Sequence, residues 1–168
     1  AVILPDDITA EIINDSKQLS AKQRTQMAEF IKSNALTYGI ANVMPEKIDE
    51  INILQASILA MHLAIDQLNT KPKFIIVDGN KFKPYQKIPH KCIIKGDAKY
   101  LNIAAASILA KKARDDYMLK IHDDFPQYNW QQNKGYPTQQ HIKAIDEHGK
   151  NHYHRKSFQI KRQLKLSL

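Results

Sequence analysis

Hydrophobic positions along the chain fall into two patterns, one with helical spacing and one of short continuous runs. Helical spacing predicts an amphipathic helix over 51–68 and another from 98 to about 122. The positions expected to face inward are Ile51, Leu54, Ile58, Met61 and Ile65 on the first helix, and Leu101, Ala105, Ile108 and Leu109 on the second. The apolar runs 74–77 and 92–94 have the length of strands, and they predict two buried strands between these helices along the chain.

Capping residues mark two further helices. Ser20 followed by Gln23 has the pattern of a capping box, in which each side chain bonds the backbone of the other, and predicts a helix over about 21–32. Thr138 is suited to cap the start of another helix, and Gly149 is suited to end it.

The order of these elements indicates the fold class. The start 1–4 and the partly alternating segment 35–43 are typical of strands, and Pro45 suits the first turn of a short helix. Strands and helices alternate, so we expect an α/β fold with a mixed sheet flanked by helices. We expect one domain over 1–168, with 122–168 as a helical, basic extension. Because the chain opens on an apolar run without an initiator Met, we also expect that a preceding segment is missing.

Charge and cysteine content narrow the function classes. The 168 residues include 25 Lys and Arg against 17 Asp and Glu, a net charge of +8. A chain this basic is attracted to polyanions, of which nucleic acid is the commonest. An anionic membrane is the weaker alternative, because we find no apolar run of about 18 residues and no lipidation signal. The single Cys92 favours a reducing compartment, and we expect a cytoplasmic protein.

Two carboxylates follow the predicted buried strands. Asp78 ends the first strand before a glycine, and Asp97 follows the second strand at the start of a predicted helix. Ligands of open α/β sheets bind at the carboxyl ends of strands, so both side chains are candidates for a site. The structural alternatives stay open, because Asp-Gly is a common turn pair and Asp is a preferred helix N-cap.

As a pair, Asp78 and Asp97 suggest metal chemistry. Two carboxylates in neighbouring connections repel each other unless a cation lies between them, and divalent ions prefer oxygen ligands. In a basic chain this points to metal-assisted hydrolysis of a phosphodiester. Two carboxylates are few for two metal ions, so the predicted site is incomplete.

Several strings of residues occur in a fixed order and together resemble bacterial ribonuclease HII, the type 2 ribonuclease H, over essentially the whole chain. They are Asp15-Ser16-Lys17-Gln18-Leu19-Ser20, Ile51-Asn52-Ile53-Leu54, Ile76-Val77-Asp78-Gly79-Asn80, Ile94-Lys95-Gly96-Asp97, Ala104-Ala105-Ala106-Ser107-Ile108-Leu109-Ala110-Lys111, Arg114-Asp115, Phe125-Pro126-Gln127-Tyr128, Lys134-Gly135-Tyr136-Pro137-Thr138 and His154-Arg155-Lys156-Ser157-Phe158. Any one string is a weak signal, but the set in this order is very specific.

The resemblance implies a ribonuclease H-like fold and an endonuclease. Such an enzyme hydrolyses RNA in RNA–DNA hybrids and nicks duplex DNA 5′ of a single embedded ribonucleotide, leaving 3′-hydroxyl and 5′-phosphate ends. The family uses Mg²⁺ or Mn²⁺ held by four carboxylates. Asp78 matches the third of these and Asp97 the fourth, so the resemblance makes both catalytic residues and metal ligands. It also favours a monomer.

The sequence departs from the family at its start. The first two carboxylates of the family lie in an Asp-Glu-x-Gly-Arg-Gly string on the first strand, in the middle of the sheet, and this sequence lacks that string. We expect a truncated sequence of a longer enzyme. The competing hypothesis is a non-catalytic module that binds RNA–DNA hybrids, because half of the metal site is absent.

Five other residues are candidates for substrate binding. The resemblance gives Tyr136 the role of recognising the ribonucleotide junction, and a tyrosine can stack on a sugar and bond a 2′-hydroxyl. Lys17, Ser107, Lys111 and Arg155 are candidate phosphate contacts. The alternatives are a half-buried aromatic anchor for Tyr136, helix packing for Ser107, and solvated surface for the three basic residues. His154 and Ser157, beside Arg155, share its two interpretations.

Overall fold

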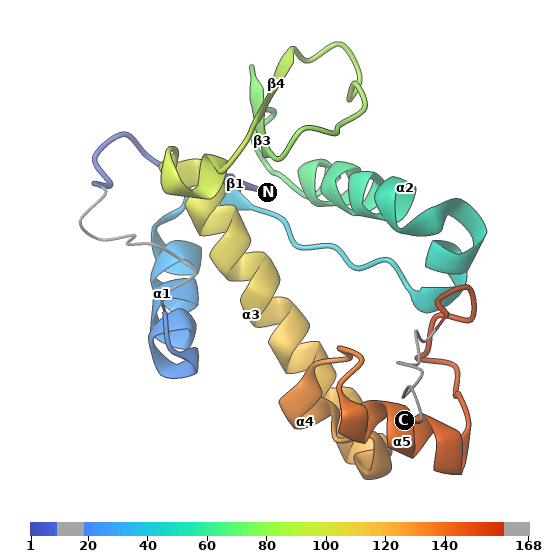
Figure 1. The fold of residues 1–168 in the computed structure, drawn as a ribbon. Coiled ribbons are helices and arrows are strands. Elements are labelled where there is room, and N and C mark those ends of the chain that lie inside the picture. The colour runs from blue at the N-terminus through green and yellow to red at the C-terminus, as the bar shows by residue number, and fades with distance from the viewer. Residues whose placement is uncertain (10–18, 160–168) are drawn as a thin grey trace, which may run out of the picture. The chain divides into compact units, whose positions relative to one another are not determined.

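The computed structural model describes residues 1–9 and 19–159 (Figure 1). The elements in chain order are β1 (Val2–Ile3), α1 (Ala21–Asn34), β2 (Thr37–Tyr38), α2 (Pro45–Asp66), β3 (Ile75–Asp78), β4 (His90–Ile93), the 3₁₀ turn η1 (Gly96–Ala98), α3 (Leu101–Asp124), the 3₁₀ turn η2 (Pro126–Tyr128), α4 (Trp130–Asn133) and α5 (Gln139–His148). The chain divides into two compact units, the first of Ala1–Val43 with Leu54–Arg114 and the second of Met44–Ile53 with Asp115–Leu168. The division falls within α2 and within α3.

The strands of the first unit form two small sheets. β1 pairs antiparallel with β2, so that Val2 lies opposite Tyr38. β3 pairs in parallel with β4, and Asp78 lies opposite Ile93 at the end of this pair. The predicted α/β class with both strand orientations is confirmed. Within the part of the chain that the structure describes, however, the strands form two separate pairs rather than one sheet.

The core of the first unit forms where α1 meets α3. Ala28 and Ile31 of α1 are fully buried and pack with Ala105 and Ile108 of α3. The capping box predicted at the start of α1 is present, since the amide of Gln23 donates to the hydroxyl of Ser20 over 3.3 Å and the Ser20 amide to the Gln23 side chain over 2.9 Å. The helix therefore begins where the sequence predicted.

Ile31 offers a direct measure of this packing. Ile31→Val removes one methylene group from a fully buried side chain and is expected to lower the free energy of unfolding by about 1 kcal/mol. Urea unfolding measures the change. Ile94→Val is the matched control, because Ile94 is 65% exposed and the same deletion there should cost less than about 0.5 kcal/mol. Equal costs at the two positions would contradict this description of the core.

α2 is interrupted at Asn52, whose backbone angles (φ 66°, ψ 165°) are not helical. The break separates the short helix predicted at Pro45 from the longer one predicted after it. Leu54 is 42% exposed, against the prediction that it faces inward, although it lies on the same unbroken stretch of helix as the buried Ile58 and Ile65. By length and composition alone α2 could cross a membrane. The uninterrupted part after Asn52 spans only about 21 Å at 1.5 Å per residue, short of a hydrocarbon core of about 30 Å.

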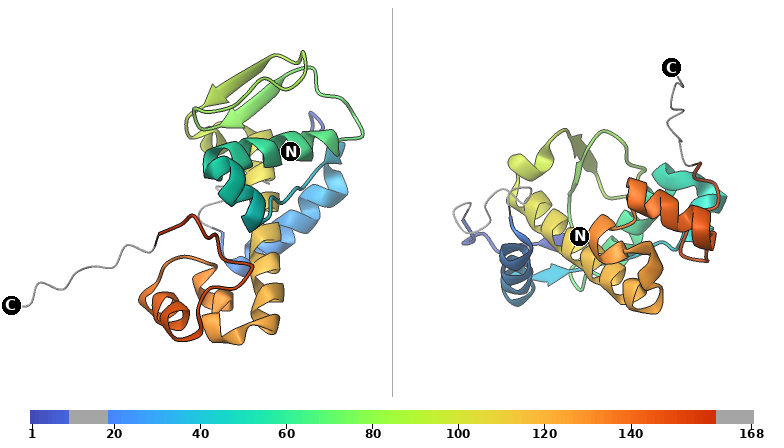
Figure 2. Two further views of the ribbon diagram at one scale, coloured as in Figure 1. Left: turned by 90° about the vertical axis from the view of Figure 1, so that its right-hand side faces the viewer. Right: turned by 60° about the horizontal axis from the view of Figure 1, so that its bottom comes forward.

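The second unit is built around an aromatic cluster. Tyr128 and Trp130 are buried and stacked, with their ring centroids 5.0 Å apart. α5 begins at the predicted cap, where the hydroxyl of Thr138 accepts from the amide of His141, and it ends at Gly149 with a positive φ of 75°. Figure 2 shows α4 and α5 from two further sides.

Candidate functional site

Asp78 stands at the carboxyl end of β3, where its side chain is exposed. The parallel pairing with β4 brings the chain that leaves β4 alongside this end, because Asp78 lies opposite Ile93. The amide of Gly96 then donates a 2.8 Å hydrogen bond to Oδ1 of Asp78. Asp78 is thus tied to the connection after β4, as the prediction of neighbouring strand ends requires.

Gly96 leaves room for this close approach. A Cβ atom at position 96 would lie 2.6 Å from Cδ1 of Ile103 on α3 and 3.5 Å from Oδ1 of Asp78. Lys95, just before it, adopts a left-handed conformation (φ 55°) that turns the chain into η1. Only a residue without a side chain can occupy position 96 without displacing its neighbours.

Asp97 follows Gly96 directly and is 9% exposed, so its carboxylate is largely withdrawn from water. The structural alternative, that Asp97 is the N-cap of the next long helix, is wrong. Asp97 lies inside η1, and α3 begins only at Leu101, after the amide of Tyr100 has bonded to the carbonyl of Gly96. The residue directly before Asp97 is therefore the one whose amide binds Asp78.

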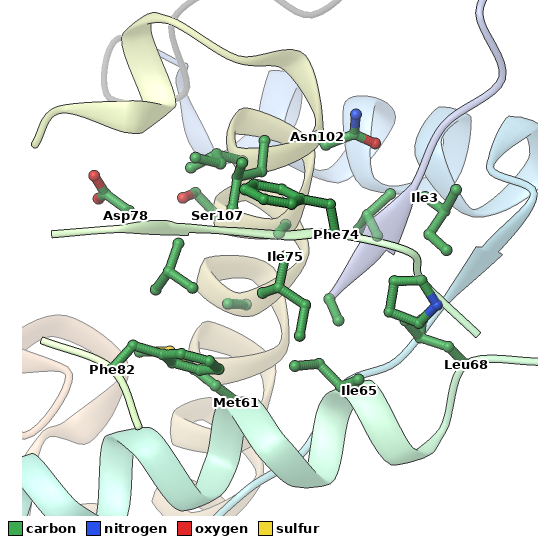
Figure 3. Close-up of a pocket in the computed structure, with 18 of the residues that line it drawn as sticks. Ile3, Met61, Ile65, Leu68, Phe74, Ile75, Asp78, Phe82, Asn102 and Ser107 are labelled. Atoms are coloured by element: carbon green, nitrogen blue, oxygen red, sulfur yellow. The ribbon is translucent and has the colours of Figure 1, made fainter. Parts of the chain in front are cut away.

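A groove of about 520 Å³ runs from this strand end across the first unit. Its walls come from four elements and include Ala1–Ile3, Met61 and Ile65, Phe74–Asp78, and the α3 residues Asn102, Ile103, Ala106 and Ser107. Figure 3 shows Asp78 and Ser107 at one end of the groove and Ile3 and Leu68 at the other. Ser107 thus lines the same groove as Asp78, while half-buried Lys111 lies one helical turn further along α3.

The donor set at the strand end suits a hard divalent cation. Such ions prefer carboxylate oxygens, and Asp78 and Asp97 would supply two of them. Residues 1–9 and 19–159 contain no group of three or more His, Cys, Asp or Glu side chains arranged to hold a metal ion. Among these residues, Asp78 and Asp97 are thus too few to form a complete ligand set by themselves.

Tyr136 belongs to the second unit and presents its ring to solvent. It is 59% exposed, so the alternative of a half-buried anchor is wrong. Its backbone is held firmly, since its amide donates to the carbonyl of Asn133 over 2.8 Å and its own carbonyl accepts from the amide of Thr138 over 2.8 Å. Nδ1 of His141 lies 3.0 Å from the same carbonyl. A fixed backbone with an exposed ring is the geometry that stacking on a ligand requires.

Arg155 lies in a segment fixed by its neighbours. Its guanidinium sits 3.7 Å from the centre of the Phe158 ring. The carboxylate of Asp49 accepts the amides of Lys156 over 2.7 Å and Ser157 over 2.9 Å, together with the Ser157 hydroxyl. The Ser157 bonds are the main cause that holds the pKa of Asp49 below its usual value. Ser157 is thus engaged within the protein, contrary to the phosphate interpretation.

Asp49→Asn tests this tether. The variant keeps one acceptor oxygen and loses the charge, so we expect faster solvent exchange of the Lys156 and Ser157 amides, measured by hydrogen–deuterium exchange. The pKa of Asp49 is lower in the folded chain than in the unfolded chain. Its contribution to the stability of this segment is therefore fully present above the unfolded pKa and is lost as the pH falls through the folded pKa. Asp6→Asn, at another exposed position, should leave these amides unchanged. Unaltered exchange in Asp49→Asn would contradict the tether.

His154, predicted as a phosphate contact or as part of a basic surface, is buried at 9% exposure. Nε2 of His154 lies 3.3 Å from Nε2 of His141, which in turn accepts from the indole of Trp130 over 3.1 Å. Neither His154 interpretation is correct, because the ring packs against Tyr128 and Trp130. Sequence analysis also missed Asp49, since its partners lie more than 100 residues away along the chain. Lys17 lies outside the described residues.

The sequence of this chain is similar to those of known proteins over most of its length. Residues 5–161 match the family model described as ribonuclease HII. Ribonuclease HII of Christiangramia forsetii is 59% identical over 160 residues, which cover 95% of this chain and 81% of that protein. Ribonuclease HII of Bacteroides thetaiotaomicron is 56% identical over 160 residues, covering 95% and 80%.

Solved structures share the fold. The ribonuclease H2 of Pyrococcus horikoshii aligns with a TM-score of 0.75 at 24% identity, over 89% of this chain and 79% of that one. The ribonuclease HII in a complex with PCNA from Archaeoglobus fulgidus aligns with a TM-score of 0.67 at 19% identity, over 93% and 82%. At these identities the likeness concerns the fold.

Proposed function

Because the chain belongs to the ribonuclease HII family, we propose that it is an endoribonuclease that hydrolyses the RNA strand of RNA–DNA hybrids. We further propose that it nicks duplex DNA 5′ of an embedded ribonucleotide and leaves 3′-hydroxyl and 5′-phosphate ends. The observation that carries this proposal is the hydrogen bond from the Gly96 amide to Asp78. This bond holds the end of β3, which bears Asp78, against the turn that bears Asp97.

Members of this family depend on divalent metal ions, and Mg²⁺ or Mn²⁺ is the ion proposed for this chain. Asp78 and Asp97 would hold it. When bound, such an ion stabilises the negative charge that develops on the phosphate and lowers the pKa of water. Gly96 keeps Asp78 in place, and the burial of Asp97 removes water that would compete for its oxygens.

The remaining ligands are proposed to come from the Asp-Glu-x-Gly-Arg-Gly string of the family, which the printed sequence does not contain. The groove supports this placement. Both β1 and β3 line it, each of these strands has one paired neighbour among the described strands, and Asp78 lies at one end of the groove. An extended segment in the groove could pair with both strands and deliver its carboxylates beside Asp78.

The other candidate residues are proposed to bind the substrate. Ser107 lines the groove that ends at Asp78 and would contact a phosphate, with Lys111 one turn away. Tyr136, exposed on a fixed backbone, would stack on the sugar of the ribonucleotide and bond its 2′-hydroxyl. Arg155 and Lys17 would contact backbone phosphates. We also propose a cytoplasmic monomer with a single ribonuclease H-like domain over 1–168.

The deciding experiment incubates the 168-residue chain with a duplex that carries one ribonucleotide, with and without Mn²⁺. A second arm adds a peptide with the Asp-Glu-x-Gly-Arg-Gly string, or fuses the corresponding segment of a relative to the chain. We expect metal-dependent nicking on the 5′ side at least in the second arm. Hybrid binding without nicking in either arm would instead favour a non-catalytic module.

A further inference from the structure

The chain between the two strand-end carboxylates is strongly basic. Residues 79–99 hold six lysines and a single carboxylate, Asp97, which is buried. All six lysine side chains are exposed: Lys81, Lys83, Lys87, Lys91, Lys95 and Lys99. These six residues are called the lysine surface below. The segment from β3 to β4 forms the loop at the top of Figure 1.

The apolar side chains of the same loop face the protein. Phe82, Tyr85 and Ile88 pack with Ile65 of α2. The ring of Phe82 lies 5.1 Å from that of His62 on α2. Phe82, Tyr85 and Ile88 are thus turned towards the protein, while Lys81, Lys83 and Lys87 of the same loop are exposed; beyond β4, the apolar Ile94 is exposed as well.

Polar bonds fix the loop in this position. The hydroxyl of Tyr85 donates to the carboxylate of Asp66 on α2. Nε2 of His62 lies 3.1 Å from the carbonyl oxygen of Lys83, and the amide of Ile88 donates to the carbonyl of Tyr85 over 3.2 Å. A loop held at several points presents its charges without a large loss of backbone freedom on binding, which favours association.

The charges of the lysine surface are not neutralised by neighbouring carboxylates. Across 1–9 and 19–159, no carboxylate lies within ion-pair distance of any of its six ammonium groups, although that of Lys99 bonds to the carbonyl of Ile94 over 3.0 Å. Three lysines on the helices differ, since Lys32 pairs with Glu29, Lys47 with Glu50 and Lys143 with Glu147. The lysine surface is thus a local excess of positive charge.

We propose that the lysine surface binds the phosphate backbone of a nucleic-acid duplex. The proposal rests on the proposed function for the placement of the duplex, because the lysine-bearing segment begins next to Asp78 and runs through Asp97. Lysines act on phosphates as point charges and carry no information about the sugar or the base. The lysine surface therefore sets the affinity for duplexes in general and leaves the discrimination of ribonucleotides to other residues.

The test compares two triple variants that remove the same total charge. Lys81→Gln/Lys83→Gln/Lys87→Gln removes half of the lysine surface, and Lys32→Gln/Lys47→Gln/Lys143→Gln removes ion-paired lysines elsewhere. Fluorescence anisotropy measures binding of a labelled RNA–DNA hybrid and of the matching DNA duplex at several salt concentrations, in EDTA so that no cleavage occurs. Each lost phosphate contact lowers the slope of log K against log salt by about 0.9, so the first variant should lose up to about 2.7.

The control variant should keep the slope of the unmodified chain, and the first variant should weaken hybrid and DNA duplex by the same factor. Equal slope losses in both variants, or an unchanged slope in the first, would overturn the proposal. The proposal would also be overturned if the chain bound phosphatidylserine vesicles but no duplex, and if the first triple variant lost this vesicle binding. That result would assign the lysine surface to a membrane. Because binding is measured without metal, failure of cleavage would refute the nuclease function while leaving this result standing.

Discussion

Asp78→Asn is expected to abolish metal-dependent nicking and to leave binding of an RNA–DNA hybrid within about twofold. The asparagine oxygen can still accept the amide of Gly96, so the turn that bears Asp97 should keep its place. The lost negative charge, however, removes a proposed metal ligand. Changes to groups that only support a ligand already cost about 10- to 100-fold, so loss of the ligand itself should cost more than about 100-fold.

The measurement is nicking of a single-ribonucleotide duplex with Mn²⁺, in whichever form of the protein is active, beside hybrid binding without metal. Asp7→Asn removes the same charge from an exposed position of the first unit and serves as the control. It should leave both quantities unchanged. If Asp78→Asn lost binding and nicking in equal measure, Asp78 would act through the structure of the strand end rather than through a metal ion.

Local elements were predictable because their signals lie within a few residues of one another. The capping box of Ser20 and Gln23 and the cap at Thr138 depend on contacts three residues apart, and both are present. Inward positions on α3 followed from helical spacing, as the burial of Ala105, Ile108 and Leu109 confirms. The prediction for Leu54 was wrong although the residue keeps the helical spacing of Ile58 and Ile65, because it lies in the first turn after the break at Asn52 and periodicity cannot show which turns of a helix the protein covers.

The candidate site was predictable in outline and not in detail. Strand-end position made Asp78 and Asp97 candidates, because parallel strands bring their carboxyl ends to one edge, and the family resemblance supplied their proposed roles. It could not show that Gly96 makes the connecting bond, since that depends on the packing of η1 against Ile103. Likewise the basic string around His154 suggested a surface, although contacts with Trp130 and His141 bury its histidine.

Two buried histidines of the second unit make its stability depend on pH. The indole of Trp130 can only donate, so Nε2 of His141 accepts its bond and the His141 proton resides on Nδ1, facing the carbonyl of Tyr136. The pKa of His154 is lowered from 6.5 to about 4, above all by burial and in smaller part by the nearby charges of His141 and Lys150. Burial also lowers the pKa of His141.

The sign of the effect follows from the two states of His154. Between pH 6.5 and about 4 the unfolded chain binds a proton at this residue and the folded chain does not. The contribution of neutral His154 to the free energy of unfolding is therefore fully present above the unfolded pKa, and it falls as the pH drops through this window. A shift of this size corresponds to about 3 kcal/mol between pH 7 and pH 4.

Urea unfolding between pH 4.5 and 7.5 isolates this contribution when the chain is compared with His154→Phe. The phenylalanine keeps an aromatic ring beside Tyr128 and Trp130 but cannot take up a proton, so its stability should fall less steeply towards low pH. His152→Gln changes an exposed histidine of the same segment and should follow the unmodified chain. Parallel curves for His154→Phe and the unmodified chain would mean that burial of His154 does not control acid unfolding. A flatter curve would show that the segment bearing Arg155 is held in place by a histidine that must stay neutral.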